Sequence, residues 1–220
     1  MGAKNRPIEV KQSDREILSS YYGDKLRQFG HDTRSLGWIP GGRDVRFGAL
    51  AGIGNLEGCR ILDVGCGFGD LNGFLKRRGI SVDYTGIDIT PGFVEIATKA
   101  YPEARFVAGD FEGWDYAGEC DWAFAAGVFT LRISDSEAFA QNVLRKMLGT
   151  SARGVAADFL MPTYSSGDAY WRPPPAEMLR YCRTLSRRVV LRCDYMADEY
   201  CIYIYRDDST DERNVFTGQA

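Results

Sequence analysis

The pattern of apolar and polar positions divides the chain of 220 residues into three parts. From about residue 60 onward, short apolar runs alternate with amphipathic segments, which predicts strands and helices in turn. Before that point the pattern predicts two helices, separated by a segment rich in Gly and Pro. We therefore expect an N-terminal helical extension or lid over 1–55, a single α/β domain over 56–206 and a polar tail over 207–220.

The predicted elements of the α/β domain follow one another as strand–helix–strand units. Strands are expected at 60–64, 82–88, 105–108, 121–126, 154–159, 188–193 and 199–206. Helices are expected at 13–30, 45–50, 70–78, 91–100, 134–148 and 175–185. The patterns from Ser13 to Glu16 and from Ser134 to Glu137 are typical of capping boxes, which would start two of these helices. Because no helix fits between the last two strands, that pair must be antiparallel.

A glycine-rich turn after the first strand is the strongest chemical signal. The run ILDVGCGFGDL contains Asp63, Gly65, Gly67, Gly69 and Asp70. Glycines at such a turn let the backbone bend tightly and approach a ligand. A dinucleotide site would place pyrophosphate where Asp63 and Asp70 bring negative charge, so these acids disfavour a nicotinamide-dependent oxidoreductase. The same charges favour a ligand that carries an ammonium and a sulfonium, such as S-adenosylmethionine (SAM).

Two more acids follow the next two strands. Asp88 ends the second strand and can accept hydrogen bonds from both hydroxyls of a ribose. Asp110 follows the third strand, where an acid can accept a hydrogen bond from an adenine amino group while Phe111 packs on the ring. Each acid alone could equally be a loop residue or a helix N-cap. Together with Asp63 they would lie at one edge of the sheet, where open α/β sheets bind ligands.

With these motifs, the run from about Cys59 to Arg206 resembles the class I SAM-dependent methyltransferase family. The resemblance implies a Rossmann-like, seven-stranded, mostly parallel sheet whose last strand is antiparallel, with helices on both faces and SAM as the cofactor. It also implies that the cofactor contacts Asp63, Gly65, Cys66, Gly67, Gly69, Asp88, Ile89, Phe93, Asp110, Phe111, Ala126 and Gly127. Arg46, in the N-terminal extension, could pair with the methionine carboxylate of SAM or could be a solvated arginine on a helix face.

The implied reaction is an in-line (SN2) transfer of the sulfonium methyl group to a nucleophile. Because SAM supplies the electrophile, such an enzyme needs a base only where the nucleophile must lose its proton early. His31 and Asp158 are the candidates for a base, although each could equally be a polar loop residue. A substrate pocket could be lined by Tyr22, Trp38, Phe129, Thr130, Arg132 and Tyr164, although such aromatic residues also pack in cores.

Missing motifs limit the substrate class. Enzymes that methylate exocyclic amines of bases, or a glutamine amide, typically carry Asn or Asp, then Pro-Pro and Tyr or Phe, after strand four. This chain has Gly127-Val128-Phe129-Thr130 there, and it lacks the Pro-Cys pair of cytosine C5 enzymes. We therefore expect a small-molecule acceptor, methylated at O, N or C, and no nucleic acid partner. The alternatives are a catalytically inactive SAM- or nucleoside-binding partner protein and a methyltransferase that acts on RNA or protein.

Composition adds a few constraints on location and partners. The formal net charge of −3 gives no general attraction for phosphate backbones. The six cysteines form no C-x-x-C pair and the chain has one histidine, so we expect no metal site. We also expect a reducing, cytoplasmic location. The N-terminal residues lack the apolar core of a signal peptide, and no apolar run is long enough to cross a membrane.

Overall fold

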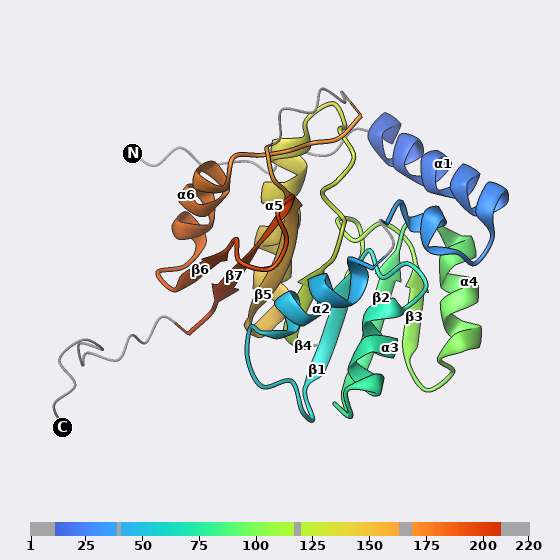
Figure 1. Cartoon of the computed structure of the whole chain (residues 1–220), viewed down its shortest axis with the longest axis horizontal. Helices are drawn as coiled ribbons and strands as arrows, with labels where there is room; N and C mark the ends of the chain where they lie inside the picture. The colour runs from blue at the N-terminus through green and yellow to red at the C-terminus, as the bar shows by residue number, and fades with distance from the viewer. Residues whose placement is uncertain (1–11, 39–40, 117–119, 163–168, 208–220) are drawn as a thin grey trace, which may run out of the picture.

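The computed structural model describes residues 12–38, 41–116, 120–162 and 169–207. Its centre is one sheet of seven strands in the order β3-β2-β1-β4-β5-β7-β6, shown in Figure 1. The strands are β1 (Arg60–Val64), β2 (Asp83–Asp88), β3 (Arg105–Ala108), β4 (Cys120–Ala125), β5 (Ser151–Leu160), β6 (Val189–Arg192) and β7 (Glu199–Tyr205). The helices are α1 (Gln12–Phe29), α2 (Arg43–Ala51), α3 (Asp70–Arg77), α4 (Pro91–Ala100), α5 (Ser136–Thr150) and α6 (Pro175–Leu185), with a 3-10 helix η1 (Thr33–Leu36).

The strand directions confirm the predicted fold class. Neighbouring strands from β3 to β5 run parallel. In contrast, β7 is antiparallel to both β5 and β6. Parallel strands are covered on both faces, and accordingly every residue of β1 after Arg60 is buried. The chain therefore has the expected Rossmann-like, seven-stranded, mostly parallel sheet with an antiparallel last strand.

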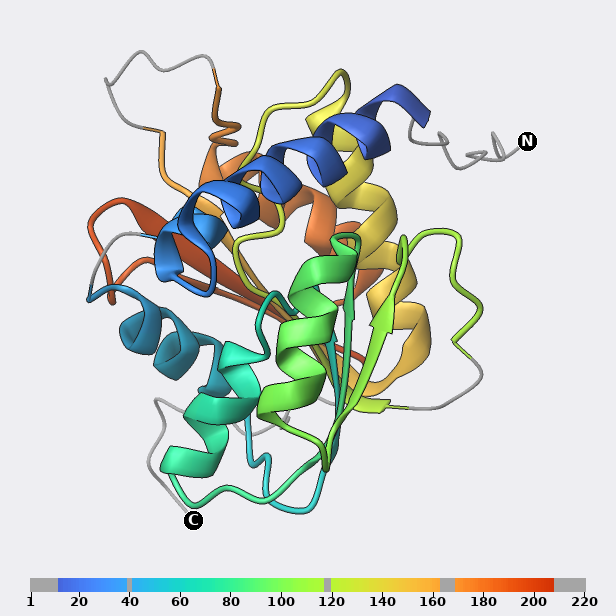
Figure 2. The ribbon, with the colours of Figure 1, turned by 90° about the vertical axis from the view of Figure 1, so that its right-hand side faces the viewer.

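Helices cover both faces of this sheet, which lies edge-on between them in Figure 2. Successive strand residues point to opposite faces. In β1, for example, Ile61 packs with Leu71 of α3 and Leu50 of α2, in one apolar cluster. The next residue, Leu62, belongs to the opposite cluster, which contains residues of α5 and α6 such as Leu144. Helix α4 packs beside β2 and β3 at the right of Figure 1.

The N-terminal extension packs directly on the α/β domain. Helix α1 lies across the carboxyl ends of the strands, above the sheet in Figures 1 and 2. In its first turn, the buried carboxylate of Asp14 accepts hydrogen bonds from the backbone N–H and the hydroxyl of Ser134, in the loop before α5. Toward its other end, Leu26 packs so closely over Gly92 that a Cβ there would lie 2.5 Å from it. The domain boundary at residue 55 stays a prediction of the sequence.

The start of α5 differs from the predicted capping box at Ser134. Asp135 caps the helix instead, since its side chain accepts a hydrogen bond of 3.0 Å from the N–H of Ala138. The helix therefore begins at Ser136. Ser134 serves a different contact, because its hydroxyl donates to the carboxylate of Asp14.

The segment between α1 and α2, which is rich in Gly and Pro, contains the 3-10 helix η1. Asp32 caps η1 by accepting a hydrogen bond of 2.9 Å from the N–H of Arg34. Gly37 ends it in a left-handed conformation, with φ of 72°. A single 3-10 turn is too short to leave a periodic pattern in the sequence. The proposed capping box of α1 depends on Ser13, whose side chain lies outside the described residues.

The cysteines carry no disulfide or metal centre in the described part of the chain. All six are free thiols, and Cys193 alone is exposed. Burial raises the pKa of Cys182 to about 12, as expected for a core thiol. No group of His, Cys, Asp and Glu within the described ranges is placed to hold a metal ion. In the same ranges, none of the helices combines the length and apolar character that a membrane span requires.

Candidate cofactor site

A cavity opens at the carboxyl ends of β1 to β4, beneath α1. It encloses about 1020 Å³ of space not filled by atoms, including solvent at its mouth. Its walls come from the ends of β1 and β2, the turns that follow these four strands, and helices α1, η1, α2, α3, α4 and α5. This edge of the sheet is the place where open α/β sheets bind ligands.

The glycine-rich turn after β1 forms the floor of this cavity. Gly65 and Gly67 have positive φ angles of 71° and 53°, a backbone region that favours glycine. A Cβ on Gly65 would lie 2.6 Å from Cγ2 of Val128, and one on Gly67 would lie 2.8 Å from Leu36. Neither position has room for a side chain. The turn therefore packs tightly against the loop after β4 and against η1.

Asp63 carries a buried carboxylate that is only partly satisfied. The side chain, in β1, belongs to a residue that is 2% exposed and lines the cavity. Its Oδ2 accepts a hydrogen bond from the hydroxyl of Tyr84, whereas its Oδ1 has no partner. Burial raises the pKa of Asp63 to about 7, although the bond from Tyr84 opposes this shift. An unpartnered carboxylate oxygen in a cavity is a site for a positively charged ligand group.

Asp70, the first residue of α3, adds a second acid to the same wall. Its Oδ1 accepts a hydrogen bond of 2.8 Å from Nη1 of Arg43, while its buried Oδ2 has no partner. Burial raises the pKa of Asp70, and the nearby Arg43 opposes that shift. A negative side chain here occupies the helix N-terminus that would otherwise bind phosphate. The geometry thus agrees with the expectation that this mouth disfavours pyrophosphate.

Asp88 ends β2 and is fixed by the backbone. Its Oδ2 accepts the N–H of Gly67 at 2.9 Å, and its Oδ1 accepts the N–H of Thr90 at 2.8 Å. Burial raises the pKa of Asp88, even though both N–H groups favour the ionised form. These bonds hold the carboxylate in one orientation at the cavity wall. A carboxylate held in this way can still accept hydrogen bonds from a pair of hydroxyls, because each oxygen has two lone pairs.

Asp110, after β3, is paired with a residue of α1. Nε of Arg15 lies 2.8 Å from Oδ2 of Asp110, and Nη2 of Arg15 lies 4.0 Å from Oε2 of Glu112. The N–H of Glu112 also donates to Oδ1 of Asp110, at 3.1 Å. All three residues line the cavity. The acid predicted to approach adenine is therefore also a contact between α1 and the sheet edge.

Aromatic rings form one side of the cavity around Phe93. Tyr22 of α1 and Phe68 of the glycine-rich turn both meet Phe93 edge to face, with ring centroids 6.1 Å and 4.8 Å away. His31 packs edge to face on Phe68 at 4.6 Å, behind the residues that line the cavity. Tyr22 and Phe93 therefore give the cavity an aromatic surface, which suits a planar ring in a ligand.

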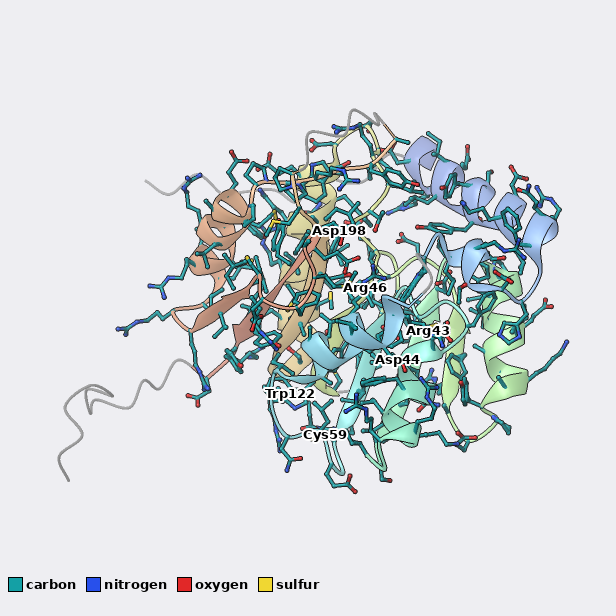
Figure 3. All side chains as sticks on the ribbon, in the orientation of Figure 1. Arg43, Asp44, Arg46, Cys59, Trp122 and Asp198 are labelled. Carbon is teal, nitrogen blue, oxygen red and sulfur yellow. The ribbon has the colours of Figure 1, made fainter. Side chains whose placement is uncertain are left out.

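A cluster of buried charges lies next to the cavity. Nε of Arg46 is 2.8 Å from Oδ2 of Asp158 and 2.8 Å from Oε2 of Glu199. Arg46 belongs to α2 and is labelled in Figure 3, whereas Asp158 and Glu199 belong to β5 and β7. Burial raises the pKa of Asp158, and the positive charge of Arg46 opposes the shift. The guanidinium also lies over the ring of Trp38, 4.3 Å from its centroid.

Most residues predicted to contact the cofactor line the cavity. They are Asp63, Gly65, Cys66, Gly67, Asp88, Ile89, Phe93, Asp110, Phe111, Ala126 and Gly127. Two of the predicted substrate residues, Tyr22 and Trp38, line it as well. Position alone does not assign a binding role, so these roles stay predictions.

Other predicted site residues lie outside the lining. They are Gly69, Arg46, His31, Asp158, Phe129, Thr130 and Arg132. Phe129 is in the core, 2% exposed, and stacks on Phe159 with 5.0 Å between ring centroids. Arg132 is exposed and donates to the carbonyl of Tyr170 at 3.1 Å. Tyr164 falls outside the described residues.

Several lining residues were not predicted. They include Arg15, Leu18, Leu36, Phe47, Glu112, Phe139 and Val143. Arg15, Leu18 and Tyr22 share one face of α1, because positions three and four apart are neighbours on a helix. This spacing is visible in the sequence, so the face containing Tyr22 could have been extended to both residues.

Comparison with known proteins identifies the family. The methyltransferase domain family matches residues 61–148. A Mycobacterium tuberculosis protein named as a methyltransferase, Rv1506c, is 33% identical over 153 residues, which cover 66% of this chain and 91% of that protein. A trans-aconitate 2-methyltransferase of Escherichia coli is 31% identical over 117 residues, or 53% of this chain. The match spans only 46% of that enzyme.

Solved structures share the fold. DhpI in complex with SAM and HEP has a TM-score of 0.66 at 16% identity, and the alignment covers 89% of this chain and 99% of DhpI. Magnesium protoporphyrin IX methyltransferase from Synechocystis PCC 6803 with bound SAM has a TM-score of 0.64 at 17% identity, covering 91% of this chain and all of that one. The chain is an α/β protein of the Rossmann-like methyltransferase fold. It belongs to the class I SAM-dependent methyltransferases.

The cavity fits the cofactor of this family. SAM carries an ammonium and a sulfonium, and the wall offers two buried carboxylate oxygens without partners, on Asp63 and Asp70. The nucleoside part would require a hydrogen-bond acceptor for the ribose and an apolar surface for the ring. Asp88 and Phe93 supply these features on the same wall.

Proposed function

We propose that the protein transfers a methyl group from SAM to a small molecule, at an oxygen, nitrogen or carbon atom. The observation that carries the proposal is the unpartnered Oδ1 of Asp63 inside a cavity that α1 covers. The names of similar proteins support a small acceptor, since two of them act on trans-aconitate and on magnesium protoporphyrin IX. The six free thiols support a reducing, cytoplasmic location.

The chain's own residues would hold the cofactor by charge and shape. Asp63 would pair with the ammonium group, Asp88 would accept the ribose hydroxyls, and Asp110 would accept the adenine amino group. Phe93 and Phe111 would pack on the adenine ring. When bound, SAM supplies an electrophilic methyl group on a positively charged sulfur.

Positioning and exclusion of water are then the main tasks of the protein. Holding two reactants in line can contribute roughly 7–11 kcal/mol to lowering the barrier. Helix α1 and the apolar side chains of Leu18, Leu36 and Trp38 would keep water from the reacting atoms. No residue is assigned as a base, because His31 and Asp158 are both outside the cavity lining.

Calorimetric titration with S-adenosylhomocysteine (SAH) tests cofactor binding, and a screen of acceptors with labelled SAM tests transfer. Saturable binding of SAH and a labelled product with a small acceptor are the expected results. Binding of SAH without any product, across acceptors that include RNA and protein, would favour the catalytically inactive binding protein. Tighter binding of NADH than of SAH would contradict the cofactor assignment.

A further inference from the structure

The charged cluster of Arg46, Asp158 and Glu199 joins three elements behind the cavity wall. The side chains are 11%, 4% and 2% exposed, so solvent does little to screen the charges. Buried ion pairs stabilise a fold only weakly and can often be replaced by apolar residues. Stability by itself therefore gives no reason for three buried charges at this place.

The contacts of Asp158 suggest a different role. While Oδ2 faces Arg46, Oδ1 accepts a hydrogen bond of 2.6 Å from the N–H of Gly127, in the turn after β4. Gly127 has a φ of 75° and lines the cavity together with Val128. Val128 packs so closely against the glycine-rich turn that a Cβ on Gly65 would lie 2.6 Å from its Cγ2.

We propose that the cluster of Arg46, Asp158 and Glu199 positions the turn after β4 against the amino-acid half of the bound cofactor. The inference rests on the proposed function, because it takes SAM as the ligand of the cavity. Asp158 is thus a positioning residue and not a base, since both of its oxygens are already engaged. Arg46 also positions Trp38, because its guanidinium lies over the Trp38 ring, and Trp38 lines the cavity as well.

Two ligands that differ in the amino-acid half separate this role from a general structural one. SAH contains the nucleoside and the amino acid, whereas 5′-methylthioadenosine contains the nucleoside without the amino acid. For Asp158→Ala we expect about tenfold weaker SAH binding, the size of one charge-assisted hydrogen bond, and methylthioadenosine binding within about twofold of wild type. Asp158→Asn keeps an oxygen for the N–H of Gly127, and we expect it to restore SAH binding to within about threefold.

Arg46→Lys provides a second test if Asp158→Ala does not fold. Lysine keeps the charge but cannot bridge both acids with a planar fork, so SAH should bind more than about threefold weaker while methylthioadenosine is unaffected. Tyr205→Phe is the matched control. It removes a buried hydrogen bond of 2.9 Å from the Tyr205 hydroxyl to the carbonyl of Ile53, which also joins β7 to the segment after α2. Its affinity for both ligands should equal that of wild type.

The outcomes distinguish the two proposals. If the wild-type protein fails to bind SAH, the proposed function is wrong. If wild type binds SAH and the folded Asp158 and Arg46 variants lose affinity for both ligands equally, or for neither, the positioning role is overturned. A selective loss for SAH supports it, provided that circular dichroism and thermal unfolding show a folded variant.

Discussion

Ionisation of Asp63 should make cofactor binding depend on pH. Burial raises the pKa of this carboxyl from 3.8 to about 7. Since one pKa unit corresponds to about 1.4 kcal/mol, ionising Asp63 in the free protein costs roughly 4 kcal/mol more than in water. The pKa of Asp63 is higher in the folded than in the unfolded protein, so protonated Asp63 contributes to the free energy of unfolding. This contribution is complete below about pH 4 and is lost as the pH rises through about 7.

An ammonium group of a ligand would favour the ionised form of Asp63, whereas burial favours the protonated form. It pairs with the ionised carboxylate, so binding near pH 6 must release the proton of Asp63. With a free-state pKa of about 7, roughly 0.9 proton should be released near pH 6, and SAH should bind about tenfold weaker there than near pH 8. Burial also raises the pKa of Asp70 and Asp88, so part of the proton release can belong to these acids.

Calorimetry in buffers of different ionisation enthalpy measures the number of protons released. Asp63→Asn isolates the contribution of this residue, because the amide oxygen still accepts the hydroxyl of Tyr84 but does not titrate. We expect the variant to bind SAH more weakly and to release markedly fewer protons near pH 6. Proton release near zero in the wild type, or equal release in Asp63→Asn, would refute the assignment of the ammonium site.

Three further predictions concern the glycine-rich turn, the ribose contact and the docking of α1. Gly65→Ala places a Cβ 2.6 Å from Val128 at a φ of 71°. We expect it to lower the free energy of unfolding in urea by roughly 1–3 kcal/mol and to weaken SAH binding. An unchanged SAH affinity would contradict close packing between this turn and the loop after β4. Asp88→Ala should abolish SAH binding in a protein whose circular dichroism is native, whereas an affinity within about threefold of wild type would rule out the ribose contact. Asp14→Ala removes both bonds to Ser134, at roughly 1 kcal/mol each, so hydrogen exchange in α1 should accelerate. Exchange as slow as in wild type would show that these bonds do not hold α1 on the domain.

Local sequence patterns predicted the first and last residue of several elements correctly. The structure has a strand at Arg60–Val64, a helix at Pro91–Ala100, a strand at Arg105–Ala108 and a helix at Pro175–Leu185, as expected. Proline in the first helical turn defines both of these helices, because it fits there and has no N–H to satisfy. The acids at the strand ends could be placed in one cavity for a related reason, since parallel strands present their carboxyl ends at one edge.

Contacts between distant segments could not be predicted in the same way. Arg46 and Glu199 are 153 residues apart, and their meeting depends on how α2 packs on β7. Nothing in the local pattern distinguishes Arg46 from a solvated arginine, so its partners were unpredictable. The sequence places Phe129 in the predicted substrate pocket for a similar reason, because an aromatic residue near a site resembles one that packs in the core beneath it.

The bond between Asp14 and Ser134 has a consequence for synthesis of the chain. The two residues are 120 positions apart, so at a typical translation rate α1 precedes its docking site by roughly 6 to 24 s. Most of the stability of a helix in a protein comes from tertiary packing, so α1 gains most of its order when it docks. The part of the protein that is made first is therefore completed late, because a nascent chain that stops before Ser134 lacks the residue that binds Asp14.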